Sequence, residues 1–174
     1  GLRRPLRPAL SPRAPAPMLR RLLLVSVGFV VAAGAGMIFL PLAALTDATI
    51  RDAGLTAVFA ALLDAADGYD PENALAAIGF VLWAMGVAVC AAPLAIVALI
   101  GEAAGARAYA WYAGGSAVLA AAAPWILRAA RGSARAGEMN AAEGRLALLY
   151  FLTGALTGTI YWLIAARGAP SRAS

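Results

Sequence analysis

Four long apolar blocks dominate the sequence and constrain its fold more than any other feature. They cover residues 22–45, 74–101, 108–127 and 146–166. Each reaches the roughly 20 residues that a helix needs to cross a hydrocarbon layer about 30 Å thick. Because the lipid interior offers no hydrogen-bond partners, each block must satisfy its own backbone as a helix. The sequence therefore predicts an all-α fold, an integral membrane four-helix bundle formed by residues 18–174.

The composition supports a membrane location. The chain is 63% hydrophobic and 13% charged, whereas a soluble domain is about half apolar and about a quarter charged. The first block also has features of a signal peptide, since Arg20 and Arg21 precede it and residues 33–35 resemble a cleavage site. The apolar run continues to Leu45, so we expect an uncleaved helix.

Missing residue types limit the chemistry that the chain can perform. It contains no His and a single Cys, and its 14 basic residues are all Arg. The usual haem ligand, the commonest metal ligand and the usual general base are therefore absent. A Schiff-base lysine and an internal disulfide are absent too. We expect no enzyme activity, no cofactor and no metal site, and we expect Cys90 to be an inert buried side chain.

Residues 1–17 are rich in Pro and Arg, show no periodicity and are predicted to be disordered and non-helical. Three interpretations stay open. In the first, translation starts at Met18 and the segment is an over-extended reading frame or an expression remnant. In the second, the segment is a basic tail on the membrane surface. In the third, it is a cleaved organelle presequence.

The distribution of Arg predicts the orientation. Most Arg residues lie before the first block, between the second and third blocks, or after the fourth. The positive-inside rule then places both termini in the cytoplasm. If the chain starts at Met18, the two sides carry equal numbers, and Arg20 and Arg21 still favour the same orientation.

The sequence predicts a further helix between the first and second blocks, and a defined start and a kink for the helix of the second block. Residues 53–66 form an amphipathic helix that lies flat on the outer surface or caps the bundle, with its apolar stripe on Leu55, Val58, Phe59, Leu62 and Leu63. The acids around it form a solvated loop, a partner-docking surface or an ion site. The helix that contains the second block starts before it, with Asp70 as N-cap and Pro71 at the first helical position, and it kinks at Pro93.

Two sets of residues are candidate interaction sites. Small residues recur at a spacing of four and predict close helix packing, within the chain or on a partner; they are Gly28, Ala32, Gly36, Gly154 and Gly158. After the third block, Arg128, Arg131 and Arg135 share one helix face and either contact lipid headgroups or dock an acidic partner or phospholipid. Nothing in the sequence indicates nucleic-acid binding.

These features favour a non-catalytic accessory or assembly subunit of a larger membrane complex, with the lipid bilayer and other membrane subunits, or further copies of the chain, as partners. The alternative is a small transporter or channel that acts as a homo-oligomer, with a pore lined by Ser116, Thr153 and Thr157. A third hypothesis is an enzyme on lipid-like substrates that uses loop residues such as Asp64 and Arg135.

The C-terminal stretch GTIYWLIAARGAP contains a Tyr-Trp pair, a short apolar run and an Arg-Gly tail. It resembles the ends of small four-helix inner-membrane proteins of GC-rich proteobacteria. The resemblance covers the last helix and implies location in a bacterial inner membrane, without any assigned activity or site residues.

Overall fold

The helices of the chain follow the apolar blocks. The computed structural model describes residues 16–66, 71–130 and 141–167, and within them the chain is helical apart from short links, without a strand. The elements are α1 (Ala16–Thr46), α2 (Ala48–Ala66), α3 (Pro71–Gly86), the π-helical segment η1 (Val87–Ala91), α4 (Ala92–Ala104), α5 (Tyr109–Ala130), α6 (Ala141–Tyr161) and the π-helical segment η2 (Trp162–Ala166). The predicted all-α class is confirmed.

Three segments of the described chain are long and apolar enough to cross a membrane: Met18–Thr46, Leu75–Ala104 and Ala141–Ala166. α5 occupies the third predicted block but is not among them. Its first half carries Tyr109, Trp111, Tyr112 and two glycines, which lower its mean hydropathy. The chain is thus a helical protein with three membrane-span candidates, and the fourth span stays a prediction.

Two helix starts bear on the sequence predictions. α1 begins at Ala16, slightly inside the segment predicted to be non-helical. Pro17 is tolerated there because a helix leaves the N–H groups of its first turn without helical partners. α3 begins at Pro71, as predicted, whereas the predicted N-cap Asp70 lies outside the described residues.

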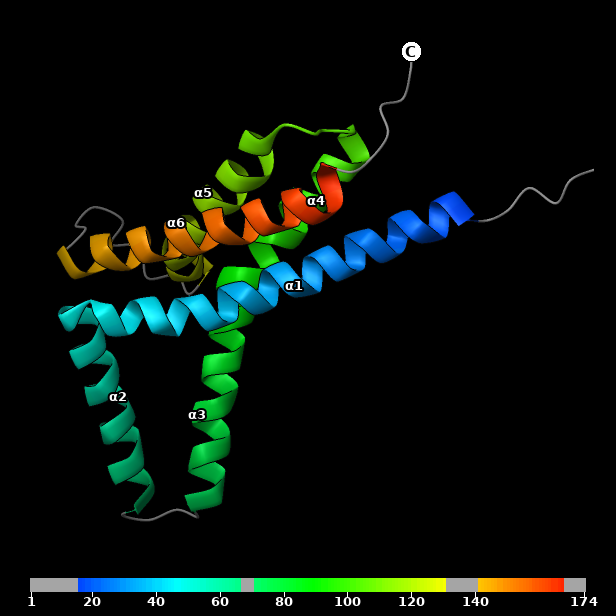
Figure 1. Ribbon diagram of the computed structural model, residues 1–174. Coiled ribbons are helices and arrows are strands. Elements are labelled where there is room, and N and C mark those ends of the chain that lie inside the picture. The colour runs from blue at the N-terminus through cyan, green and yellow to red at the C-terminus, as the bar shows by residue number, and fades with distance from the viewer. Residues whose placement is uncertain (1–15, 67–70, 131–140, 168–174) are drawn as a thin grey trace, which may run out of the picture.

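The second apolar block is interrupted at the predicted kink. η1 ends directly before the first turn of α4, which contains the buried Pro93. The Ala92 N–H donates to the Val87 carbonyl, five residues back. A wider turn of this kind accommodates Pro93, which has no N–H and whose ring crowds the carbonyl four residues earlier. In Figure 1 the chain changes direction between α3 and α4.

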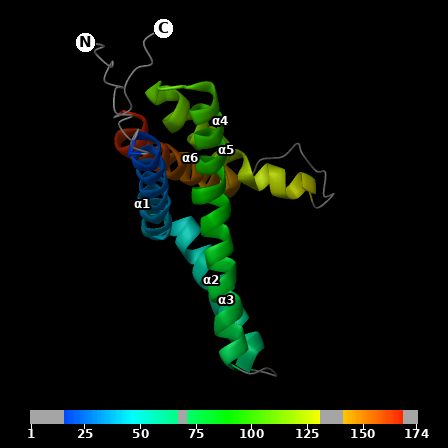
Figure 2. The ribbon, with the colours of Figure 1, turned by 90° about the vertical axis from the view of Figure 1, so that its right-hand side faces the viewer.

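The packed part of the molecule contains α1, η1, α4, α5 and α6. α6 runs antiparallel to α1 on one side and to α5 on the other (Figure 1). One cluster of buried side chains is centred on Leu94, Tyr112 and Tyr161, and a second contains Leu40, Cys90 and Leu149. In Figure 2 the start of α1 and η2 lie at the same end of the molecule.

α2 and α3 extend away from this packed part as a two-helix arm (Figures 1 and 2). A helix is therefore present where residues 53–66 predicted one, although it is longer. It does not cap the bundle, because the described members of its apolar stripe are exposed, Phe59 by 62% and Leu63 by 66%. That part of the prediction is wrong, since α2 leaves α1 at Asp47 and pairs with α3 instead. Its position at a membrane surface stays a prediction.

Candidate functional site

The predicted glycine pair of α6 lies against the backbone of α5. A Cβ added at Gly158 would collide with the carbonyl oxygen of Tyr112 and lie 2.8 Å from the Cα of Ala113. At Gly154 it would meet the carbonyl oxygen of Ser116 in the same way. Because both obstacles are backbone atoms, they cannot move aside as a flexible side chain would. These two residues set the closest approach of α5 and α6.

The predicted small-residue face of α1 lies against α6, η1 and η2. Gly28 faces Ile164 and Ala165, and Ala32 is fully buried among residues of the first cluster. A Cβ added at Gly36 would collide with the Thr157 Cγ2 and lie 3.1 Å from the Cys90 Sγ. All five small residues singled out in the sequence therefore lie at contacts within the chain.

Three buried hydroxyl residues lie at the same contacts: Ser116, Thr153 and Thr157 are at most 1% exposed. The Thr153 hydroxyl donates to the Leu149 carbonyl at 2.8 Å, and that of Thr157 donates to the Gly154 carbonyl at 3.0 Å. Both bonds stay within α6, a common way for a helical threonine to satisfy its own hydroxyl. Within the described part of the chain, the Ser116 Oγ has no hydrogen-bond partner. In the single chain these residues are interior, and none lines an open surface.

Aromatic side chains fix the turn between α4 and α5. The Tyr112 hydroxyl donates to the Ala106 carbonyl at 3.0 Å, and the Trp111 Nε1 donates to the Val97 carbonyl at 3.1 Å. Gly105 ends α4 in the left-handed conformation, with φ of 68°. That conformation suits Gly because it has no Cβ.

An ion pair ties the start of α1 to the end of α4 near this turn. The Arg21 Nη2 donates to the Glu102 Oε2, and the two side chains are 47% and 23% exposed. Arg21 precedes the first apolar block and Glu102 follows the second. The two residues were not predicted to pair, although their positions at span ends on the same predicted side indicated that they could meet.

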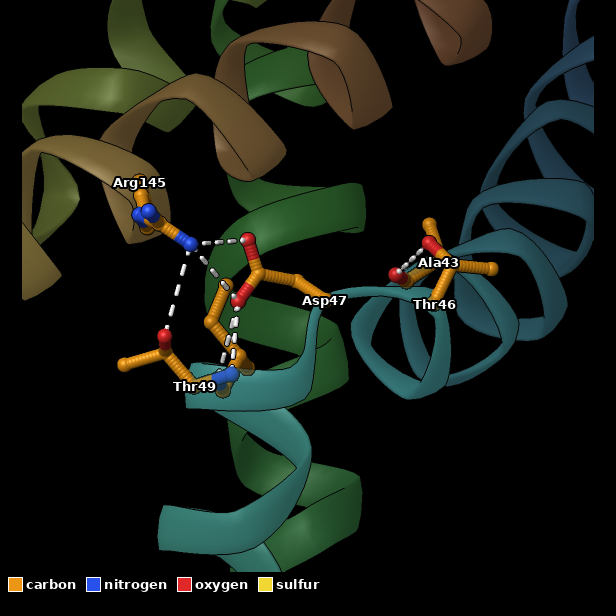
Figure 3. Close-up of polar contacts among 6 residues, drawn as sticks. Ala43, Thr46, Asp47, Thr49 and Arg145 are labelled. Carbon is orange, nitrogen blue, oxygen red and sulfur yellow. Dashed lines mark hydrogen bonds and ion pairs between the residues drawn. The ribbon is translucent and has the colours of Figure 1, made fainter.

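A second ion pair ties the end of α1 to the start of α6 (Figure 3). The Arg145 Nη1 lies 3.2 Å from Asp47 Oδ2 and 3.3 Å from the Thr49 hydroxyl. Asp47 Oδ1 also accepts the backbone N–H groups of Thr49 and Ile50, at 2.9 and 3.1 Å. Asp47 is thus the N-cap of α2, and it sits at the junction where the arm leaves the packed helices.

The pKa of the Asp47 carboxyl lies below its usual value of 3.8, because the Ile50 N–H, Arg145 and the Thr49 N–H all favour the carboxylate. The contribution of these contacts to folding stability is fully present above pH 3.8 and is lost as the pH falls through the lowered pKa. A carbon-detected NMR titration of the detergent-solubilised protein measures the pKa of Asp47. Arg145→Gln should raise the midpoint part of the way toward 3.8. A wild-type midpoint at or above 3.8 would contradict the arrangement at α2.

Several predicted interaction residues lie outside what the structure describes. Arg131, Arg135, Asp67 and Asp70 fall outside the described ranges, and Arg128 and Asp64 lie in helices whose side chains are not described at these positions. Among the described residues there is no group of three or more His, Cys, Asp or Glu side chains placed to hold a metal ion. Cys90 is buried and makes no disulfide.

No family model, curated protein or solved structure matches the chain. The described fold and contacts therefore define the general class of the protein. It is a helical protein with three membrane-span candidates, whose helices meet at close glycine contacts and are linked by an ion pair at each end of α1.

Proposed function

We propose that the chain is a non-catalytic accessory or assembly subunit of a larger membrane complex, and that the arm is its docking element. The observation that carries this is the exposure of α3. Phe80, Val81, Leu82 and Trp83 are consecutive and each is at least 58% exposed. Successive helical residues are rotated by about 100°, so these four side chains cover all sides of the helix. A spanning helix that packed on its own bundle would bury one of them.

The predicted helix-packing residues are not the ones that contact the partner. The small-residue faces of α1 and α6 are occupied by contacts within the chain. The partner surface is therefore assigned to the arm, where α2 contributes the exposed Phe59 and Leu63 beside α3. Aromatic side chains such as Trp83 are the kind of anchor that carries much of the energy of protein interfaces.

The proposal includes α5 as a fourth span and both termini in the cytoplasm of a bacterial inner membrane. The described Arg20, Arg21, Arg107 and Arg167 belong to one end of the packed helices, in line with the positive-inside rule. The rise of a helix separates Arg21 from Asp47 by about 39 Å along α1. A hydrocarbon layer of about 30 Å fits between the two ion pairs.

The transporter or channel alternative has less support. Its proposed pore residues Ser116, Thr153 and Thr157 are enclosed within one chain, so a pore between copies would require α5 and α6 to separate. The hypothesis of an enzyme that uses Asp64 and Arg135 rests on side chains outside the described part of the chain, and it stays a hypothesis.

The experiment is gentle detergent extraction from the native membrane, followed by native-gel sizing and mass spectrometry. We expect the wild-type chain to comigrate with a larger membrane partner at fixed stoichiometry. Trp83→Ala should weaken this association by about 30-fold, the equivalent of about 2 kcal/mol for a central aromatic contact. Leu99→Ala, at a 72% exposed position of α4 outside the arm, is the matched control and should leave it unchanged. Migration of the wild type alone, or only with itself, would contradict the proposal.

A further inference from the structure

Two aromatic side chains, the side chain of one arginine and the backbone of a second arginine meet at one corner of the molecule. The corner consists of Arg107 in the α4–α5 turn, Tyr109 at the start of α5, Trp162 in η2, and Arg167. The Trp162 Nε1 donates to the Arg107 carbonyl at 2.9 Å. The Arg167 guanidinium carbon lies 5.9 Å from the centre of the Trp162 ring, and Tyr109 packs edge-on against the same ring at 5.4 Å.

These contacts hold the corner in a defined shape. The Tyr109 hydroxyl also lies 3.2 Å from that of Thr159 on α6. Trp162 therefore links the turn to η2 through its N–H and holds Arg167 on its ring face. A cation–π contact uses the face of the guanidinium and leaves its N–H donors for an anion. Arg107 and Arg167 are both exposed.

The charge around the corner is predominantly positive. Arg20 and Arg21 lie at the same end. Among the described residues of this end, Glu102 is the single carboxylate, and it is paired with Arg21. The opposite end carries Asp47, Asp52 and Glu143 with Arg51 and Arg145. The described charges of the corner thus attract anions, and the described charges of the far end do not.

Apolar surface adjoins the arginines. Leu163 follows Trp162, is 49% exposed and belongs to the candidate span Ala141–Ala166. Tryptophan and tyrosine are the residues that mark headgroup depth in membrane proteins. We propose that this corner binds an anionic phospholipid, with Arg107 and Arg167 donating to the headgroup phosphate and an acyl chain lying along Leu163. The adjoining apolar span favours a lipid over an acidic peptide.

The test uses the full chain in nanodiscs of phosphatidylglycerol and phosphatidylcholine in equal amounts. The protein is released into mild detergent, and native mass spectrometry counts the lipids that stay bound. We expect the wild type to retain phosphatidylglycerol in preference to phosphatidylcholine. The double variant Arg107→Gln and Arg167→Gln should reduce this preference about 30-fold, because each substitution removes a positive charge that attracts the net negative charge of phosphatidylglycerol, which the zwitterionic phosphatidylcholine lacks. Arg51→Gln, an exposed arginine at the far end, is the control and should retain it.

Three results would overturn the proposal. The first is equal retention of the two lipids by the wild type. The second is an equal loss in Arg51→Gln, which would indicate nonspecific attraction by net charge. The third is displacement of the bound lipid by millimolar inorganic phosphate, which would identify a free-anion site. Trp162→Phe keeps the aromatic ring but lacks the N–H donated to Arg107, and it should lower the preference while leaving the helix content unchanged by circular dichroism.

Discussion

Gly158→Ala is expected to destabilise the folded chain, whereas Gly114→Ala on the facing helix is expected to leave it unchanged or slightly more stable. The new Cβ at position 158 would overlap the Tyr112 carbonyl oxygen, so α5 and α6 would have to move apart along their contact. Overpacking of this kind typically costs about 1–3 kcal/mol, and a backbone obstacle favours the upper part of that range. Gly154→Ala should behave similarly, and Gly158→Leu should separate the two helices.

Gly114 is the matched control because it lies in α5, two residues after Tyr112, and a Cβ there meets no atom within 4 Å. Alanine is favoured over glycine in a helix by up to about 1 kcal/mol. Unfolding of purified protein in mixed micelles with increasing SDS, followed by circular dichroism, gives the free energy of each variant. Equal effects of Gly158→Ala and Gly114→Ala would show that the α5–α6 contact is not as close as described.

Arg21→Glu is expected to destabilise the chain by about 1–3 kcal/mol. This destabilisation is larger than the loss of an exposed ion pair and smaller than the loss of one partner from a fully buried pair. The Glu102 side chain is 23% exposed, and the substitution would place a second carboxylate beside it. Adding Glu102→Arg to the same chain restores opposite charges and should recover at least half of the loss. The same SDS unfolding experiment measures both variants.

Arg20→Glu is the matched control, since Arg20 is adjacent and exposed and the substitution changes the net charge equally. Its effect should stay within about 0.5 kcal/mol, as for most surface substitutions. If Arg20→Glu costs as much as Arg21→Glu, the cause is the charge at the membrane end and not the pair. Absence of recovery in the double variant would lead to the same conclusion.

Hydropathy was enough to predict helices in the four apolar blocks, because a segment without charges has one way to satisfy its backbone in lipid. The helical period of the apolar stripe predicted α2. The Gly154 and Gly158 spacing indicated a packing face, but it could not name the neighbour, since any helix backbone can approach a glycine. The direction of α2 was also beyond the sequence. Its stripe from Leu55 to Leu63 requires an apolar environment, which the bundle, a lipid surface and a partner all provide.

The two ion pairs show a related limit. Arg21 with Glu102, and Asp47 with Arg145, are far apart in sequence and belong to different helices. Hydropathy places each at the end of a span, while pairing depends on which helices are neighbours and on their rotation. Pro93 predicted the bend in the second block, but not the π-helical turn that accommodates it. That turn is one of several local solutions, and it places Val89 and Cys90 in the second buried cluster.

The contact between α1 and the α6–η2 segment has a consequence for the order of biosynthesis. The small-residue face of α1 is synthesised first, yet most of the surface that covers it, from Thr157 to Ala165, is translated after α2, α3, α4 and α5. Cys90 of η1 comes earlier and covers Gly36 alone. The α5–α6 hairpin can form locally, whereas α1 has to wait for most of its partner surface, more than a hundred residues downstream. Until then its glycine face is open to any other helix in the membrane, so the interval between insertion of α1 and of α6 is when the nascent chain is most exposed to mispairing.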